Sequence, residues 1–286
     1  MRRLFALFIL LIALGAGLYT ERVEVLDWYR GVTAPVLPEA VGFEAVEIFA
    51  PSVPSVPSAP SDLSESEPPK IAVPEIQEQD AQEPPPTPAE EESALPASIN
   101  LAVPFTSQAP NGNWDELYQE ACEEASVYMV HAYFSGVDEG KIPADTADAE
   151  LLKIVDFENE LYGFYQDTTA EQAGMFAELM YGHTYQVLNN PSVEDIQRTL
   201  VQGHPVIVPA AGRLLGNPYF TAPGPLYHML VIRGYTQDGQ FIVNDPGTYR
   251  GEAYLYDFDT IMNAMHDWND GKQITDGKKV VLVLSP

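Results

Sequence analysis

The sequence is poor in cysteine and in basic residues, and each shortage excludes a class of protein. It holds one cysteine, Cys122, in 286 residues, so neither an internal disulfide nor a cysteine-rich zinc site can form. Lys and Arg number 14 against 42 Asp and Glu, which gives a formal net charge of −28. Nucleic acids and anionic membrane surfaces need a basic face on their partner, so we expect neither to be the main partner.

The five histidines do not form a recognisable metal-binding pattern either. No two of them stand at a ligand spacing such as HxxxH, and we expect the protein to need no metal or organic cofactor. Four of them are expected to be packing or surface residues: His131, His183, His204 and His266.

The first twenty residues, MRRLFALFILLIALGAGLYT, have the pattern of an export signal. Arg2 and Arg3 precede an uninterrupted apolar run from Leu4 to Leu18. The run is short for a full membrane span, so residues 1–20 are predicted to be either a cleaved signal peptide or a retained membrane anchor. Because the arginines stay inside, the rest of the chain is expected outside the cytoplasm, membrane-anchored or, after cleavage, secreted.

Residues 21–97 are predicted to be a linker. Residues 21–33 alternate charged and apolar groups and favour a short helix, whereas residues 34–97 are rich in Pro, Ser, Glu and Ala. Such a composition buries too little apolar surface to offset its ordering entropy, and its prolines favour extended conformations. Residues 39–100 hold 13 acidic residues and one lysine, so a large part of the total charge is assigned to this spacer.

Residues 98–286 are predicted to be the folded domain. Helices are expected at residues 121–136, 146–160, 169–182, 192–203 and 257–268. Strands are expected at residues 99–104, 184–188, 205–209, 229–235, 240–244, 252–256 and 279–284. Helices followed by an antiparallel sheet are the order of an α+β fold, with the early helices packed on the later sheet.

Cys122 lies in the first turn of the most apolar of these helices. Small and apolar residues recur there at helical spacing: Cys122, Ala125, Ser126, Met129, Val130 and Tyr133. The partial positive charge at a helix N-terminus stabilises a thiolate. Taken alone, however, a cysteine in this position is either a nucleophile or a small buried hydrophobe.

His228 and Asp245 could complete a catalytic group with this thiol. His228 stands before an apolar strand, and Asp245, 17 residues later, ends the next strand across a predicted hairpin with Asp238-Gly239 at its turn. Antiparallel pairing brings the start of one strand beside the end of the other. A thiol needs a base, and the base needs a group that holds its tautomer. The alternatives are a structural histidine and a turn-forming aspartate, with Asn244 as a substitute orienting residue.

Several segments together resemble the peptidase C-39-like family, and the resemblance covers about residues 98–286. They are VPFTSQAPNGNW, ACEEASVYMVHAYF, GHPVIVP, YHMLVIRGY and IVNDPGTY. The family comprises cysteine peptidase domains of papain-like fold, related to the bacteriocin-leader peptidases. The resemblance implies that Cys122 is the nucleophile, His228 the base and Asp245 the orienting residue. It also implies that Gln108 donates its amide to the oxyanion together with the Cys122 backbone N–H; the alternative for Gln108 is a loop surface residue.

One departure from the family pattern lies directly after the nucleophile. The leader peptidases usually have glycine there, whereas this chain has Glu123 and then Glu124. Carboxylates beside a thiol oppose thiolate formation, which predicts weaker catalysis without affecting the fold.

A long loop, residues 211–225, leads into His228 and is rich in Gly, Pro and aromatic residues. Long loops in compact domains are usually functional. Leu214, Tyr219 and Phe220 are expected to line an apolar cleft for an extended peptide, and the alternative is a well-packed connection.

The sequence therefore predicts an exported or membrane-tethered cysteine peptidase that acts on a peptide or protein substrate. A rival hypothesis is a catalytically weak papain-like domain that binds peptide or cell-wall material. A peptidoglycan amidase of the NlpC type is less favoured, because its cysteine and histidine are typically much closer in sequence than the 106 residues here.

Overall fold

A computed structural model describes residues 22–46 and 94–286 of the chain. The apolar run from Leu4 to Leu18 and most of the Pro-rich spacer lie outside these residues, so the anchor and the spacer remain predictions. Among the helices of the described part, none is both long and apolar enough to cross a membrane.

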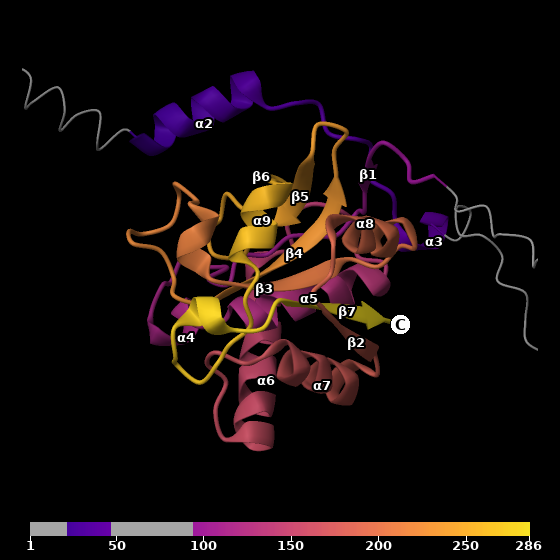
Figure 1. Cartoon of the computed structure of the whole chain (residues 1–286). Coiled ribbons are helices and arrows are strands. Elements are labelled where there is room, and N and C mark those ends of the chain that lie inside the picture. Colours follow the sequence, from indigo (N-terminus) through magenta and orange to yellow (C-terminus); the bar gives the residue numbers. More distant parts are fainter. Residues whose placement is uncertain (1–21, 47–93) are drawn as a thin grey trace, which may run out of the picture. The chain divides into compact units, whose positions relative to one another are not determined.

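A seven-stranded sheet forms the centre of the domain, with the strand order β2-β7-β3-β4-β5-β6 and β1 paired to the end of β4 (Figure 1). All of these strand pairs are antiparallel. The strands are β1 (Ile99–Asn100), β2 (Thr184–Asn189), β3 (Val206–Ala210), β4 (His228–Tyr235), β5 (Gln240–Asn244), β6 (Tyr254–Asp257) and β7 (Val280–Ser285). The predicted α+β class with an antiparallel sheet is confirmed.

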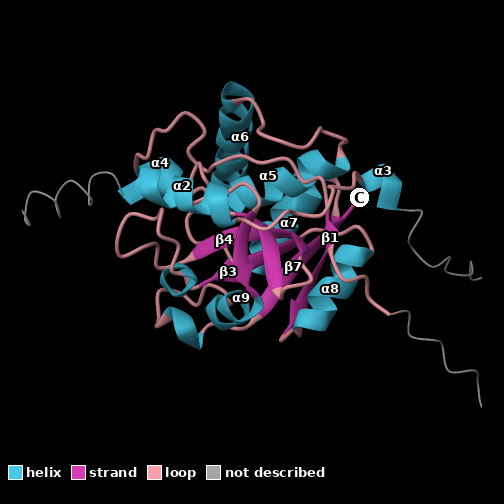
Figure 2. Cartoon of the chain, turned by 90° about the horizontal axis from the view of Figure 1, so that it is seen from above, coloured by secondary structure: helices cyan, strands magenta, loops and turns pink. Residues whose placement is uncertain are grey.

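Helices cover both faces of this sheet (Figure 2). The α-helices are α2 (Arg22–Thr33), α3 (Phe43–Val46), α4 (Glu116–Gln119), α5 (Cys122–Phe134), α6 (Ala144–Tyr162), α7 (Ala170–Tyr181), α8 (Val193–Val201) and α9 (Phe258–Ala264). Two 3₁₀ helices, η1 (Gly212–Leu215) and η2 (Ile274–Asp276), complete the set. Helices α5 and α7 lie on one face and α8 and α9 on the other, so the central strands β3, β4 and β7 are almost fully buried.

Two predicted helix starts are held by capping boxes. The Thr169 hydroxyl accepts the Gln172 N–H at the start of α7, and the Gln172 side chain returns a bond to the Thr169 N–H. Ser192 and Asp195 form the same reciprocal pair at the start of α8. Each pair satisfies backbone donors that the first turn of a helix leaves unpaired.

Helix α5 is more deeply buried than its one-sided sequence pattern predicts. Eleven of its thirteen residues are buried, Glu123 and Glu124 among them. Strand β4 lies against one side of it and helices α6 and α7 against others. The cysteine therefore begins a helix that is enclosed on nearly all sides.

The first part of the predicted linker has structure of its own. Residues 22–33 form α2, in agreement with the expected short helix, but residues 34–46 differ from the expected spacer because they contact the domain. Val41 pairs with Leu101, and the Phe43 ring packs edge-on against Tyr133 and Phe134. The prediction used the average composition of the linker, in which a few apolar residues do not stand out. Val41 and Phe43 are the residues that contact the core.

Two other predicted elements are shorter in the structure. Strand β1 ends at Asn100, although the Leu101 N–H still donates to the Arg233 carbonyl of β4. The guanidinium of Arg233, almost fully buried, then donates to the side chain of Asn100 and the carbonyl of Val103. Helix α9 ends at Ala264, where the chain extends and pairs with β3.

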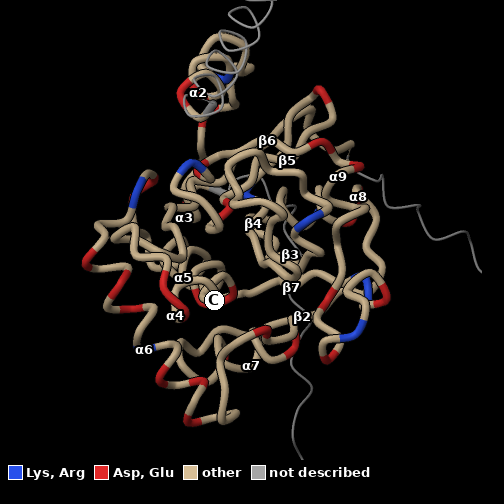
Figure 3. Tube along the Cα trace, turned by 90° about the vertical axis from the view of Figure 1, so that its left-hand side faces the viewer, with Lys and Arg blue, Asp and Glu red and all other residues tan. Residues whose placement is uncertain are grey.

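The acidic character belongs to the domain as well as to the spacer. Residues 98–286 contain 26 acidic and nine basic residues, and Figure 3 shows acidic positions spread over the helices and outer loops. Most of the 42 acidic residues thus lie in the folded domain, contrary to the emphasis that the sequence placed on the linker.

Candidate active site

Cys122 is the first residue of α5, at the edge of a pocket. Ala121 precedes it as the N-cap and offers no side-chain cap to the helix, so the first backbone N–H groups of α5 are left for other acceptors. The cysteine side chain is 5% exposed. This placement matches the prediction of a thiol at a helix N-terminus.

His228 and Asp245 form a buried pair, as the hairpin predicted. His228 begins β4, and Asp245 follows the last residue of β5, while the two strands pair from Val231 with Asn244 onward. The Nε2 atom of His228 lies 2.8 Å from Oδ1 of Asp245. Both side chains are almost completely inaccessible to water, so the contact is protected from competing solvent.

Asp245 is fully hydrogen-bonded. Besides His228, its carboxylate accepts the Gly247 N–H at 3.0 Å, the Tyr256 hydroxyl at 2.6 Å and the Asn217 amide at 3.0 Å. Burial alone raises the pKa of Asp245, but the charge and hydrogen bond of His228 and these other donors lower it below its usual value. Asp245 is therefore an ionised acceptor. Sequence analysis missed Asn217 and Tyr256, whose sole signal was their polarity near the site.

The contact with Asp245 also decides which nitrogen of His228 can react. Since Nε2 faces Asp245, Nδ1 is the nitrogen left to exchange a proton with another group, and no hydrogen bond to it occurs within residues 22–46 and 94–286. The Phe220 ring stands edge-on to the imidazole at 5.4 Å between centroids. Gly247 closes the other side, because a Cβ there would lie 2.9 Å from Cε1 of His228. The ring is thus fixed by three neighbours.

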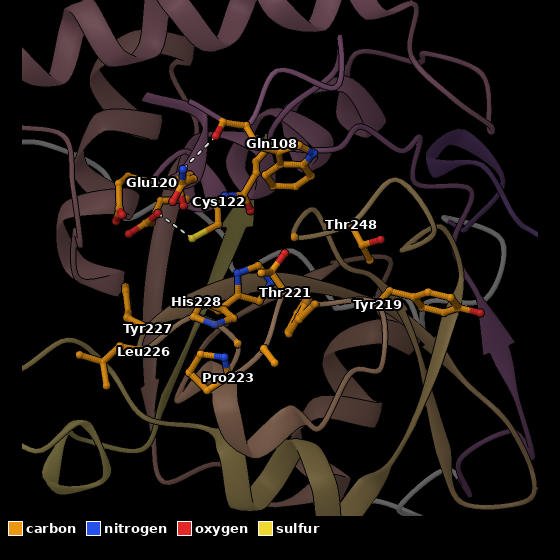
Figure 4. Close-up of a pocket in the computed structure, with 18 of the residues that line it drawn as sticks. Gln108, Glu120, Cys122, Tyr219, Thr221, Pro223, Leu226, Tyr227, His228 and Thr248 are labelled. Carbon is orange, nitrogen blue, oxygen red and sulfur yellow. Dashed lines mark hydrogen bonds between the residues drawn. The ribbon is translucent and has the colours of Figure 1, made fainter. Parts of the chain in front are cut away.

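A pocket of about 720 Å³ brings the predicted site residues together. Gln108, Cys122 and His228 line it, and Figure 4 shows them on facing sides of one space. Residues 219–227 form a wall, so the expectation that Tyr219 and Phe220 line a cleft is confirmed. Leu214 belongs to η1 and is not among the lining residues.

The thiol of Cys122 donates a hydrogen bond to a neighbouring carboxyl group. Sγ of Cys122 donates to Oε2 of Glu123 at 2.9 Å. Burial, followed by the charge and hydrogen bond of Glu123 and the charge of Glu124, raises the pKa of the Cys122 thiol well above its usual value. In this arrangement the sulfur is a protonated thiol held on Glu123.

Glu123 belongs to a buried group of three carboxyls, which we call the carboxyl cluster: Glu123, Glu124 and Glu158. Burial raises the pKa of Glu158 to about 9. Burial first, and then the neighbouring carboxyl, raises the pKa of Glu123 and of Glu124 well above the usual value. The side chains of Glu124 and Glu158 hydrogen-bond to each other, which requires a proton on one of the two carboxyls. Because an uncompensated buried charge is costly, burial favours the protonated form of all three carboxyls, and Glu158 is protonated at pH 7.

Gln108 holds the chain segment that leads to Cys122. Its side-chain Nε2 donates to the carbonyls of Tyr118 and Gln119, both at 2.9 Å. Its backbone N–H donates to the carbonyl of Pro246, next to Asp245. Both amide hydrogens are therefore engaged, and the oxyanion role that the resemblance implies requires their release.

The remaining candidates have structural roles. Asn244 donates to the carbonyls of Val103 and Pro104 and accepts the Ala253 N–H, so it is not in a position to replace Asp245. His131 stacks on Tyr181 and contacts His183 at 3.0 Å. His204 and His266 each bond a backbone carbonyl, those of Leu284 and Gly277.

Comparison with known proteins supports a family assignment. One solved structure, described as that of a C39-like peptidase from Bacillus anthracis, aligns with 15% identity and a TM-score of 0.43, over 66% of this chain and 98% of that one. No curated protein matches the sequence significantly. The profile of the Peptidase_C39 like family matches residues 100–275. That range contains the pocket and spans more than half of the chain, which therefore belongs to the Peptidase_C39 like family.

Proposed function

We propose that this protein is a cysteine peptidase that hydrolyses peptide amide bonds with Cys122, His228 and Asp245. The observation that carries the proposal is the buried 2.8 Å contact between His228 and Asp245, at a pocket that Cys122 also lines. A base with a fixed tautomer beside a thiol at a helix N-terminus is the combination that nucleophilic catalysis by cysteine requires.

The chemistry proceeds in two steps. Nδ1 of His228 takes the thiol proton, the thiolate of Cys122 attacks the amide carbonyl, and the same proton passes to the leaving amine as the carbon–nitrogen bond breaks. Water then hydrolyses the thioester, with His228 again moving the proton. The backbone N–H of Cys122 donates to the oxyanion, and Gln108 joins it when its amide leaves the two carbonyls. The Nε2 proton stays on His228 throughout and is donated to the carboxylate of Asp245.

Catalysis in this scheme begins with a rotation of the thiol. Sγ points to Glu123, so it turns about the Cα–Cβ bond toward His228 before it can be deprotonated. The carboxyl cluster opposes a thiolate on its own side, whereas a proton on the imidazole stabilises one on the other. The position of the sulfur therefore controls its acidity.

The single cysteine makes a direct test possible. Alkylation of the full chain by iodoacetamide, followed by intact mass, reports only on Cys122. We expect His228→Ala to slow labelling at neutral pH by roughly a hundredfold, because the thiolate loses its cationic partner. His204→Ala removes a partly buried imidazole away from the pocket and serves as the control. Equal labelling of the two variants and the parent chain would reject the nucleophile assignment.

A second candidate function is peptide binding with little or no hydrolysis. The bond from Sγ to Glu123 and the engaged amide of Gln108 favour it, since both hold site groups away from reactive positions. Under this function, Cys122→Ser binds an extended peptide as tightly as the parent chain does, and the parent leaves the peptide intact. Cleavage by the parent chain that Cys122→Ser abolishes decides for the peptidase.

We also propose that the domain acts outside the cytoplasm, held at a membrane by residues 1–20. The support is the sequence of that segment, two arginines followed by the apolar run from Leu4 to Leu18. Protease added to intact cells should remove the domain if it is exposed, while a cytoplasmic marker stays intact. Protection of the domain until lysis would contradict the proposal.

A further inference from the structure

Helix α2 holds the domain with one of its two faces. Oδ1 of Asp27 accepts the Tyr219 hydroxyl at 2.9 Å, and Nε of Arg250 donates to both Asp27 oxygens at 2.8 and 2.6 Å. One turn later, the guanidinium of Arg30 lies 4.0 Å from the centre of the Tyr254 ring. We call this the inner face.

The opposite face of α2 is apolar and exposed to solvent. Four residues at i, i+3, i+4 and i+7 are 50, 68, 58 and 66% exposed: Val25, Trp28, Tyr29 and Val32. At helical spacing these side chains form one stripe, and its centre lies opposite Asp27 and Arg30. No contact within the described residues covers this outer face.

The chemistry of the outer face identifies its partner. An apolar stripe containing Trp and Tyr is typical of a helix in the interfacial layer of a bilayer, where aromatic residues concentrate. In the sequence, the apolar run ends at Leu18, seven positions before Val25. Charge does not drive the contact, because the domain holds 26 acidic and nine basic residues. The partner is therefore a phospholipid surface without net charge.

We propose that the outer face of α2 lies in the interfacial layer of a membrane while the inner face holds the pocket at the membrane surface. The link to the pocket is Tyr219, which lines it and whose side chain extends outward, away from Cys122, to reach Asp27 (Figure 4). Peptide segments that lie close to the bilayer can then enter the pocket directly. The proposal holds whether the pocket cleaves its ligand or only binds it.

Quenching of Trp28 by brominated lipid tests the outer face. The full chain with Trp114→Phe and Trp268→Phe retains Trp28 as its one tryptophan and is reconstituted into phosphatidylcholine vesicles, with or without bromine near the head of the acyl chain. We expect blue-shifted emission and roughly twofold or stronger quenching, as for a ring in the interface. Emission typical of water with no quenching would overturn the proposal.

A matched variant separates the helix from the domain as a whole. Trp28→Phe and Val137→Trp, added to the same background, move the tryptophan to an exposed apolar position of the domain, where we expect no quenching. Equal quenching at that position would overturn the assignment to α2. A second copy of the chain could also cover the outer face. Blue-shifted emission that resists bromine and increases with protein density would indicate that copy and overturn the membrane contact.

Discussion

The two halves of the candidate site differ in how their buried polar groups are satisfied. On the base side, the carboxylate of Asp245 accepts four hydrogen bonds, and its partner His228 is fixed between Phe220 and Gly247. On the thiol side, the three carboxyls of the cluster are buried beside one another, and Glu123 accepts a hydrogen bond from the sulfur. The proposed base, His228, is held in the orientation that proton transfer needs, whereas the proposed nucleophile, Cys122, is held as a protonated thiol.

This difference indicates which step limits the chemistry. A satisfied polar network fixes geometry, while carboxyls buried beside one another shift their own pKa and that of a neighbouring thiol. The thiol side therefore sets the reactivity of the resting protein. Changes on the base side should reduce activity, and some changes on the thiol side should increase it.

Breaking the base side should have the largest effect. Asp245→Asn preserves the shape of the side chain but replaces the ionised acceptor that fixes the tautomer of His228. We expect cleavage, and labelling of Cys122 at neutral pH, to fall by about 10³–10⁴-fold. The control is Asp238→Asn in the exposed hairpin turn, which should have no effect. A loss of less than tenfold would mean that Asp245 does not orient the base.

Displacing the imidazole should have the next largest effect. In Gly247→Ala, the new Cβ would meet Cε1 of His228 at 2.9 Å and Phe220 at 2.8 Å. We expect a loss of about a hundredfold in kcat from misplacement of the base. Gly42→Ala, where a Cβ meets nothing within 4 Å and φ is not positive, tests for a general sensitivity to glycine replacement through thermal melting. Unchanged kcat in the alanine variant would contradict the packing described.

The carboxyl cluster predicts an unusual dependence of stability on pH. Burial raises the pKa of Glu158 from 4.5 to about 9, so the folded state holds this proton more tightly than the unfolded chain does. Its contribution is fully present below pH 4.5 and is lost as the pH rises toward about 9. Denaturant midpoints should fall with a clear slope over this range, and Glu158→Gln should reduce the total loss of unfolding free energy across it by about 1–3 kcal/mol. Glu160→Gln, exposed on the same helix, should leave the slope unchanged; an unaltered slope in both variants would contradict a buried neutral Glu158.

Removing the carboxyl that holds the sulfur should raise the reactivity of Cys122, opposite to the effect of changes on the base side. Glu123→Ala removes the carboxyl that accepts the thiol proton and raises the pKa of Cys122. We expect labelling at neutral pH to become about tenfold faster, with its pH midpoint lowered. Glu116→Ala, in the first turn of α4, is the control. A rate that stays the same or falls would show that Glu123 does not restrain the thiol.

The smallest effect is expected at the α2 contact. Asp27→Ala removes the partner of Arg250 and Tyr219 in a partly exposed ion pair, so we expect a loss of stability of about 0.2–1 kcal/mol. Salt should reduce the difference between the variant and the parent chain. Denaturant midpoints at low and high salt measure both. A loss above this range would mean that α2 is part of the core.

Sequence reasoning predicted the elements that local patterns specify. The capping box at Ser192, the buried helix after Ala121 and the hairpin that joins His228 to Asp245 each depend on residues near in sequence. It also predicted the antiparallel sheet and the family. These features follow from spacing and turn chemistry, which a single sequence displays directly.

What it could not predict depends on packing between distant segments. Glu123 and Glu124 have the composition of an exposed first turn, and only the enclosure of α5 buries them and raises the pKa of both. Asn217 and Tyr256 reach Asp245 from separate loops and strands. The donors of Gln108 were assigned to an oxyanion, yet in this structure they hold two carbonyls, since one sequence does not specify which acceptor lies nearer.

The three hydrogen bonds of Gln108 connect two separate segments of the site. Its backbone N–H donates to Pro246, in the turn that follows Asp245, and its side chain donates to two carbonyls just before Cys122. Gln108 therefore connects two parts of the site that are more than a hundred positions apart in sequence. If a ligand draws the side-chain amide away, the bonds to the Tyr118 and Gln119 carbonyls are lost together while the main-chain bond to Pro246 remains, so the segment before Cys122 is released on one side only.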